Sequence, residues 1–223
     1  MGGGYGREMK YAFAFLAALS LQESEPAPNS IVLSVTSKHK DVLRKGQVPQ
    51  YSLAAIFAKW GFTVESRVQT AWDKSLPKDS VKVVLPPKEG EKAPPAAPAA
   101  FTIEGSIDYV AKDVKFFDKT LDLINYVAEV SVIVKDAKGR ELKKIAWKNY
   151  YGASKEKGEE SVLKESESRA TRFLTVDLFQ IKEIADQVPK DKKEEFEKFL
   201  AKEKEQRDKH FDDFEAREKK TKE

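Results

Sequence analysis

Residue types that often carry out chemistry are scarce in this chain, and they are not grouped. The 223 residues include no cysteine and only two histidines, His39 and His210, which lie near opposite ends of the sequence. A chain without cysteine has no thiolate nucleophile, no disulfide and no Cys-ligated zinc. Two histidines so far apart argue against a histidine-based metal cage. We therefore expect no metal site and no cofactor.

The remaining polar patterns do not form a catalytic constellation either. The glycine-rich stretch 2–6 has no preceding strand and no Lys-Ser/Thr pair, so it does not fit a phosphate-binding loop. The carboxylate pairs 159–160 and 212–213 are adjacent on expected helix surfaces, where solvated charge explains them. His39 stands between two lysines without a carboxylate or nucleophile nearby in sequence. No catalytic residue is assigned, and we predict that the protein is not an enzyme.

Charge is abundant in this sequence but nearly balanced. It has 40 Lys and Arg against 37 Asp and Glu, a formal net charge of +3. Nucleic-acid-binding proteins usually have a basic excess on one face, so no nucleic-acid partner is expected. Trp147, Tyr150 and Tyr151 lie beside lysines, as in strands that stack on bases. Strand alternation, however, places Ile145, Trp147 and Tyr151 on one face, where core packing already explains them.

The second half of the chain shows the clearest structural periodicity. Segments 101–111, 121–134 and 142–151 alternate apolar and polar residues, which predicts strands with one buried face. A 3.6-residue pattern then predicts a covering helix over 159–188, which Pro189 ends. Three strands followed by a helix give a sheet with one covered face.

The first half predicts a strand, a helix and further short strands. The strands are expected at 31–35, from 62 onward and at 81–85, and the helix at 51–60. Gly61 stands where a C-terminal helix cap belongs. The apolar face of the helix, at i, i+3, i+4 and i+7, consists of Leu53, Ile56, Phe57 and Trp60.

These elements predict one α+β domain over 30–188. We expect a mixed or antiparallel sheet of about five strands with two helices packed on one face. Asp136 and Gly139 fit a short hairpin loop in which Gly139 adopts a positive φ. The segment 86–100 is rich in Pro and Ala, cannot bury much apolar surface and is expected as an extended, mobile insertion.

The N-terminal segment resembles a secretory signal peptide. Arg7 and Lys10 precede an apolar run over 11–21 that is too short to span a bilayer and ends in a small-x-small pattern. We assign 1–21 to this region, with the signal itself at 9–20. The prediction is a periplasmic or secreted protein that cannot be lipid-anchored through cysteine.

The segment 189–223 predicts a long charged helix, with twelve basic and twelve acidic residues from Lys190 onward. Its few apolar residues form two small clusters without a sustained heptad. Exposed aromatic residues on a charged helix suggest a partner or a second copy of the chain, and the alternative is that they pack on the protein's own body. The candidate partner-binding residues are Phe196, Phe199, Leu200, Phe211 and Phe214.

The order of elements resembles a group of bacterial envelope proteins. A strand with Ile103-Glu-Gly-Ser-Ile107, a hairpin with the Asp-x-x-Gly-x-x-Leu pattern at 136–142 and a covering helix carry the resemblance, which spans 30–188. It is similar to the lipopolysaccharide-assembly lipoprotein family, the curli-channel subunit family and the amino-terminal domain of the Tol translocation protein. Many members of these families are lipoproteins, whereas this chain has no cysteine.

The resemblance implies a non-enzymatic envelope component that binds a protein partner. A membrane-associated complex and a second copy of the chain are both open as that partner. The expected role is accessory, in assembly or transport. A nucleic-acid-binding or ribosome-associated cytosolic protein is the alternative.

Overall fold

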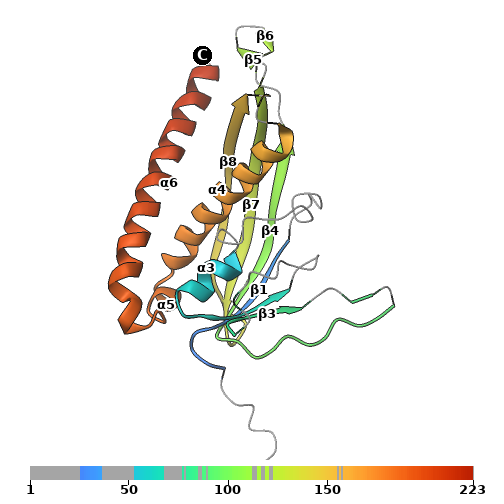
Figure 1. The fold of residues 1–223 in the computed structure, drawn as a ribbon, viewed down its shortest axis with the longest axis vertical. Helices are drawn as coiled ribbons and strands as arrows, with labels where there is room; N and C mark the ends of the chain where they lie inside the picture. The colour runs from blue at the N-terminus through green and yellow to red at the C-terminus, as the bar shows by residue number, and fades with distance from the viewer. Residues whose placement is uncertain are drawn as a thin grey trace, which may run out of the picture.

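The computed structural model confirms an α+β fold built on one mixed sheet with a long C-terminal helix (Figure 1). The structure describes residues 26–36, 53–67, 77, 79–84, 87–88, 90–111, 115–116, 119–120, 123–154, 156 and 158–222. Side chains at 115–116, 119–120, 123–124, 150, 152–154 and 214–222 are not described. The predicted signal peptide and His39 lie outside these residues.

The main sheet has six strands, in the order β3-β2-β1-β4-β7-β8. The first four in this order are parallel to one another, and β4, β7 and β8 are antiparallel. Two residues each of β5 (Lys115–Phe116) and β6 (Lys119–Thr120) form a separate small ribbon. The main strands are β1 (Ser30–Thr36), β2 (Thr63–Arg67), β3 (Val81–Val84), β4 (Phe101–Ala111), β7 (Leu123–Asp136) and β8 (Glu141–Ser154).

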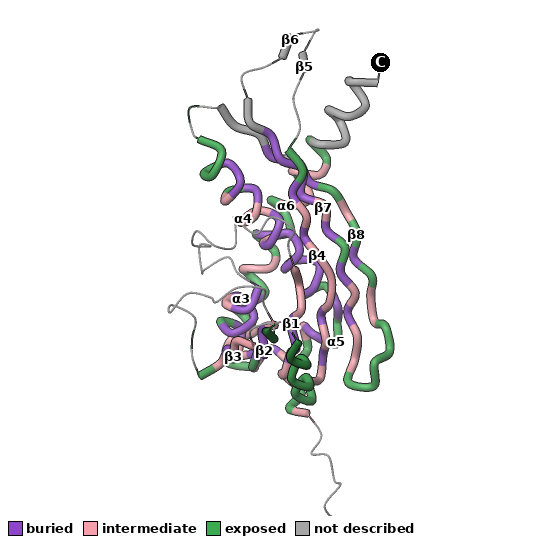
Figure 2. The backbone as a smooth tube through the Cα atoms, turned by 90° about the vertical axis from the view of Figure 1, so that its right-hand side faces the viewer, coloured by how far each residue is buried: buried purple, intermediate pink, exposed green. Residues whose placement is uncertain are grey.

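The helices lie on one side of this sheet, as the side view in Figure 2 shows. α3 contacts β2 and β3, α4 lies across β7 and β8, and α6 packs on α4 and beside β8. α6 therefore adds a further helical layer at the β8 end. The helices are α3 (Leu53–Lys59), α4 (Glu159–Phe179), α5 (Lys182–Ala185), a 3-10 turn (Lys190–Lys192) and α6 (Lys193–Lys222).

The alternation of the long strands divides the sheet into an apolar covered face and a polar open face. In β4, Ile103 and Ile107 are buried under the helices, whereas Glu104 belongs to the opposite face. There Glu104 forms an ion pair with Lys135 of the neighbouring strand β7, with 2.7 Å between Oε2 of Glu104 and Nζ of Lys135. A buried aliphatic side chain stabilises the fold by about 1.5–3 kcal/mol. The covered face therefore supplies most of the stability of the sheet.

The predicted hairpin turn between β7 and β8 is confirmed. Gly139 has a φ of 75°, and Asp136 Oδ1 accepts hydrogen bonds from the backbone N–H groups of Lys138 and Arg140. The hydrogen bond from the Arg140 backbone N–H, with that from Lys138 and the Arg140 charge, lowers the pKa of Asp136. Local turn chemistry thus fixes the register of the two longest strands.

The prediction of one helix over 159–188 is wrong. α4 ends at Phe179, Ile181 is extended with ψ near 113°, and α5 then adds one short turn. The break changes the direction of the chain while Ile181, Ile184 and Val188 all remain buried. The apolar pattern of the sequence continues through the break because α4 and α5 pack on the same core.

The turn after α3 is packed against the start of the C-terminal region. Gly61 has a φ of 89°, and a Cβ atom at this position would lie 2.7 Å from Cγ of Pro189. Trp60, the last residue of the predicted helical face, is 1% exposed. Glycine is therefore required here both for the backbone conformation and for the close approach of Pro189.

Candidate partner-binding surfaces

The first predicted C-terminal cluster packs on the protein's own body. Phe196 is 1% exposed, and its ring centroid lies 5.4 Å from that of Trp60 and 4.9 Å from that of Phe179. Phe199 is half-buried, with its ring 5.1 Å from Trp60, and Leu200 packs against the same core. Of the two alternatives for these residues, internal packing is the one that the structure has.

The second predicted cluster is also engaged internally where its side chains are described. The Phe211 ring lies 5.5 Å from Trp147 and 5.8 Å from Phe173. The side chain of Phe214 lies outside the described residues. These contacts fasten α6 to α4 and β8, so Phe211 does not present a free aromatic surface.

A buried polar seam joins α4 and α6 between the two aromatic clusters. Asp177 of α4 accepts a 2.7 Å hydrogen bond from Nε1 of Trp147. It also forms an ion pair with Arg207, whose Nη2 lies 2.7 Å from Oδ1 of Asp177. Burial raises the pKa of Asp177, and this effect outweighs the lowering by Arg207 and Trp147. Glu203 is paired with Arg172 in the same seam, with a shortest N–O distance of 2.6 Å.

The sequence analysis did not predict this seam, because Glu203 and Arg207 stand between the two small apolar clusters, where no heptad continues. The two residues are four apart on α6 and therefore lie on one face. They meet Arg172 and Asp177, which are five apart on α4. Opposite charges on two helices, four residues apart on one and five apart on the other, are the signal that could have predicted it.

His210 completes the seam at its upper end. Its Nε2 lies 2.5 Å from Oδ1 of Asn149, a buried residue of β8, and its Nδ1 lies 3.3 Å from Nη1 of Arg169. Arg169 also stacks over the Tyr151 ring at 4.5 Å. Trp147 and Tyr151 thus pack against α4 and α6, in line with the core packing that strand alternation predicted.

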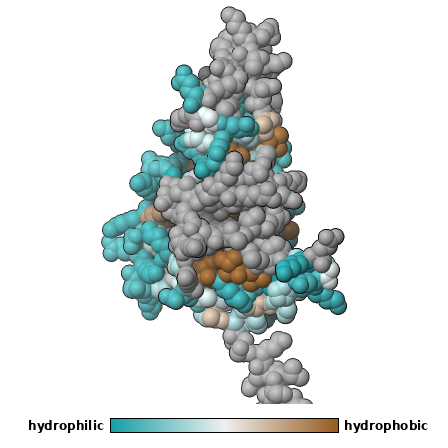
Figure 3. Space-filling model, turned by 45° about the vertical axis from the view of Figure 1, so that its right-hand side comes forward, coloured by the Kyte–Doolittle hydropathy of each residue, from teal (hydrophilic) through white to brown (hydrophobic). Residues whose placement is uncertain are grey.

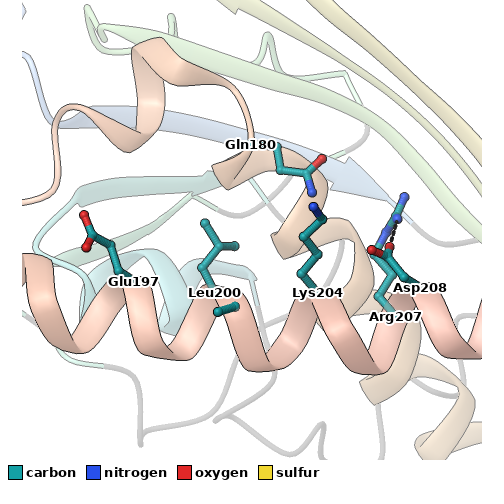
Figure 4. Close-up of a pocket in the computed structure, with 7 residues that line it drawn as sticks. Gln180, Glu197, Leu200, Lys204, Arg207 and Asp208 are labelled. Atoms are coloured by element: carbon teal, nitrogen blue, oxygen red, sulfur yellow. Dashed lines mark hydrogen bonds and ion pairs between the residues drawn. The ribbon is translucent and has the colours of Figure 1, made fainter.

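A shallow groove of about 540 Å³ runs between the end of α4 and α6 (Figure 4). Gln180 at the end of α4 and Leu200, Lys204 and Asp208 on α6 are among the residues that line it. Its Arg207 is already bound to Asp177 and Asp208. Mixed charges and an internally paired arginine give this groove no distinct ligand chemistry.

A different polar cluster lies on β2, where Glu65 is 7% exposed. Its carboxylate accepts hydrogen bonds from Nε of Arg67 at 3.0 Å and from Nζ of Lys82 at 3.3 Å. Burial alone would raise the pKa of Glu65, but the hydrogen bonds outweigh it and the pKa lies below its usual value. The carboxylate is therefore charged at neutral pH.

The Glu65 cluster holds part of the Pro/Ala-rich insertion, which we call the arm (residues 87–98). The arm projects from the sheet beyond β3 and returns to β4 without helix or strand (Figure 1). Arg67 Nη1 donates a 2.9 Å hydrogen bond to the carbonyl oxygen of Pro94, and the backbone N–H of Ala97 lies 3.5 Å from Glu65 Oε1. Every residue from Glu91 to Pro98 is exposed.

Large apolar side chains are seldom exposed on the described surface. On the side shown in Figure 3, the described residues are mainly hydrophilic, with a hydrophobic patch low on the body and smaller hydrophobic areas elsewhere. Val110, 44% exposed, is the only exposed large hydrophobic residue in the part of the chain that the structure describes. The arm is therefore the most prominent accessible feature of the described molecule.

Within the described ranges, no three His, Asp or Glu side chains come together in a way that could hold a metal ion. None of the helices there is long and apolar enough to cross a membrane. Comparison of the chain with models of known protein families and with curated proteins finds no match.

Proposed function

We propose that this protein is a non-enzymatic, periplasmic or secreted component of the cell envelope that acts through protein–protein contacts. Its role would be accessory, in assembly or transport. The observation that carries the proposal is the arm, a proline-rich segment that projects from a rigid sheet and is held by a buried carboxylate. The arm buries little apolar surface, so it contributes little to the stability of the core.

The anchoring of the arm supports a binding role. Burying a carboxylate costs free energy unless charged and polar partners compensate it. Glu65 has these partners in Arg67 and Lys82, and the same group holds the returning limb at Pro94 and Ala97. Holding an extended segment in place lowers the entropy that it loses on binding, which raises its affinity for a partner.

The envelope location rests on the signal-like segment 9–20 and on the resemblance of 30–188 to envelope proteins. N-terminal sequencing of the protein from its own cells tests this part. We expect a mature chain that begins after Leu21. A chain that still begins at Met1 or Met9 would contradict it.

Site-specific photo-crosslinking in the protein's own cells tests the contact role. A photoreactive amino acid at Ala96 of the arm should give a covalent adduct with a second protein, detected as a band of higher mass. The matched control carries the same amino acid at Lys202, an exposed position on α6. No adduct at Ala96, or the same adducts from both positions, would contradict the proposal.

A further inference from the structure

The arm contains a lysine and two prolines that are spaced three residues apart. Residues 92–98 read Lys-Ala-Pro-Pro-Ala-Ala-Pro, so Lys92, Pro95 and Pro98 follow one another at intervals of three. Each proline fixes its own φ near −65° and restricts the residue before it to extended conformations. Most positions of this stretch therefore favour the polyproline II helix.

A polyproline II helix has three residues per turn, so residues three apart share an edge. Pro94 and Ala97, the two residues that contact β2, are three apart and form the attached edge. Lys92, Pro95 and Pro98 form a second edge, which is rotated by one third of a turn from the attached one. The contacts with Arg67 and Glu65 thus hold the arm while leaving the second edge exposed.

A further contact fixes the base of this limb. The backbone N–H of Ala100 donates a 2.9 Å hydrogen bond to Oγ of Ser30 at the start of β1. The limb from Pro94 to Ala100 is therefore held at both ends, on β2 and on β1. This arrangement presents the second edge in an extended conformation before any partner binds.

We propose that Lys92, Pro95 and Pro98 form a docking edge for a partner domain that recognises polyproline II helices. This inference rests on the proposed contact role of the arm. Such domains bind prolines spaced by three in a groove of aromatic side chains. The Lys92 ammonium is placed to pair with a carboxylate at one end of that groove. The partner is thus expected to have an aromatic groove flanked by acidic residues.

The test uses the full chain and, as the probe, a purified SH3 domain that binds Lys-x-x-Pro-x-x-Pro ligands, with affinity measured by isothermal titration calorimetry. We expect binding to the wild type. Pro95→Ala or Pro98→Ala should each weaken it by about tenfold, the loss that 1.4 kcal/mol of binding free energy produces. Lys92→Ala should also weaken it, and more so at low salt because the contact is electrostatic.

The matched controls are Pro87→Ala and Lys88→Ala, the same changes at exposed positions of the arm outside the pattern. They should leave the affinity unchanged. No binding by the wild type, or equal losses in controls and pattern variants, would overturn the inference.

The crosslinking experiment separates this inference from the proposed function. If the Ala96 adduct forms in cells and persists in a Pro95→Ala, Pro98→Ala double variant, the docking edge is wrong while the contact role stands. If the adduct depends on both prolines, the docking edge is supported. If no adduct forms at Ala96 at all, the contact role itself fails.

Discussion

Two segments of this chain, α6 and the arm, lie outside the predicted core, yet they attach to the body in opposite ways. α6 is fastened by two aromatic clusters with a buried ion-pair seam between them. In the part of the chain that the structure describes, the arm is fastened to the body by polar contacts from Arg67 and Glu65. A few aromatic residues at suitable spacing are thus enough to convert a charged helix into a packed layer, whereas prolines keep a segment extended and accessible.

The largest effect is expected from removing the main aromatic anchor of α6. Phe196→Ala should lower the free energy of unfolding by about 3–5 kcal/mol, since it leaves a cavity beside Trp60 and Phe179. Urea denaturation measures this change. Lys202→Ala, on the exposed side of the same helix, is the control and should have almost no effect. A Phe196→Ala variant as stable as this control would show that α6 is not part of the folded body.

Breaking the seam should have the next largest effect. Asp177→Ala removes both carboxylate oxygens, so Nε1 of Trp147 and Nη2 of Arg207 each lose their acceptor in the seam. Loss of hydrogen bonds to a charged group should lower the free energy of unfolding by about 1.5–3 kcal/mol. Thermal and urea denaturation measure the loss. Unchanged stability in this variant would mean that the seam contributes nothing to holding α6.

Weakening the Glu65 cluster that holds the arm should change the stability of the protein less than the preceding variants do. It should change the accessibility of the arm to protease more. Glu65→Gln should lower the free energy of unfolding by about 1 kcal/mol and speed trypsin cleavage at Lys88 and Lys92, because the returning limb is released. Glu104→Gln, which removes a sheet carboxylate paired with Lys135, is the matched control and should leave the cleavage rate unchanged. Equal cleavage rates in both variants would refute the anchoring role.

The two regions should also differ in the sign of their pH dependence. Burial raises the pKa of Asp177, so its contribution to stability is fully present below the unfolded pKa and is lost as the pH rises through the folded value. Burial alone would raise the pKa of Glu65 as well, but the hydrogen bonds from Arg67 and Lys82 outweigh it and bring the pKa below its usual value. Its contribution is therefore present above the unfolded pKa of about 4.3 and is lost as the pH falls through the folded value.

Unfolding free energies measured from neutral to acidic pH check this smaller effect. As the pH falls, stability should shift in favour of the wild type relative to Asp177→Asn. Relative to Glu65→Gln, it should shift against the wild type. Shifts of the same sign for both variants would contradict the assignment of the two carboxylates.

Periodicity predicted most of the fold because burial of one face determines both strands and helices. The strands at 31–35, 81–85 and 101–111 and the face of α3 were predicted on this basis, and the hairpin at Gly139 was predicted from its turn residues. The break at Gln180 was not, since an apolar stripe continues through it. The role of the C-terminal aromatics could not be decided, because the same Phe196 pattern serves a partner or the chain's own Trp60.

The candidate site was harder to predict because its geometry depends on contacts between distant segments. The composition of 86–100 indicated an extended insertion, but only the structure shows that Glu65 and Arg67 hold one of its edges. Their alternation within β2 gave no sign of this, because a charged residue on an open sheet face is usually solvated.

The central claim, that α6 is a packed layer whereas the arm is the accessible surface, is tested most directly by hydrogen–deuterium exchange of the full chain. Amides of α6 between Phe196 and Phe211 should exchange as slowly as those of α4, because both open only when the body unfolds. Amides at Lys92, Ala93 and Ala96 should exchange within the shortest labelling time. Fast exchange throughout α6, or slow exchange in the arm, would contradict the account.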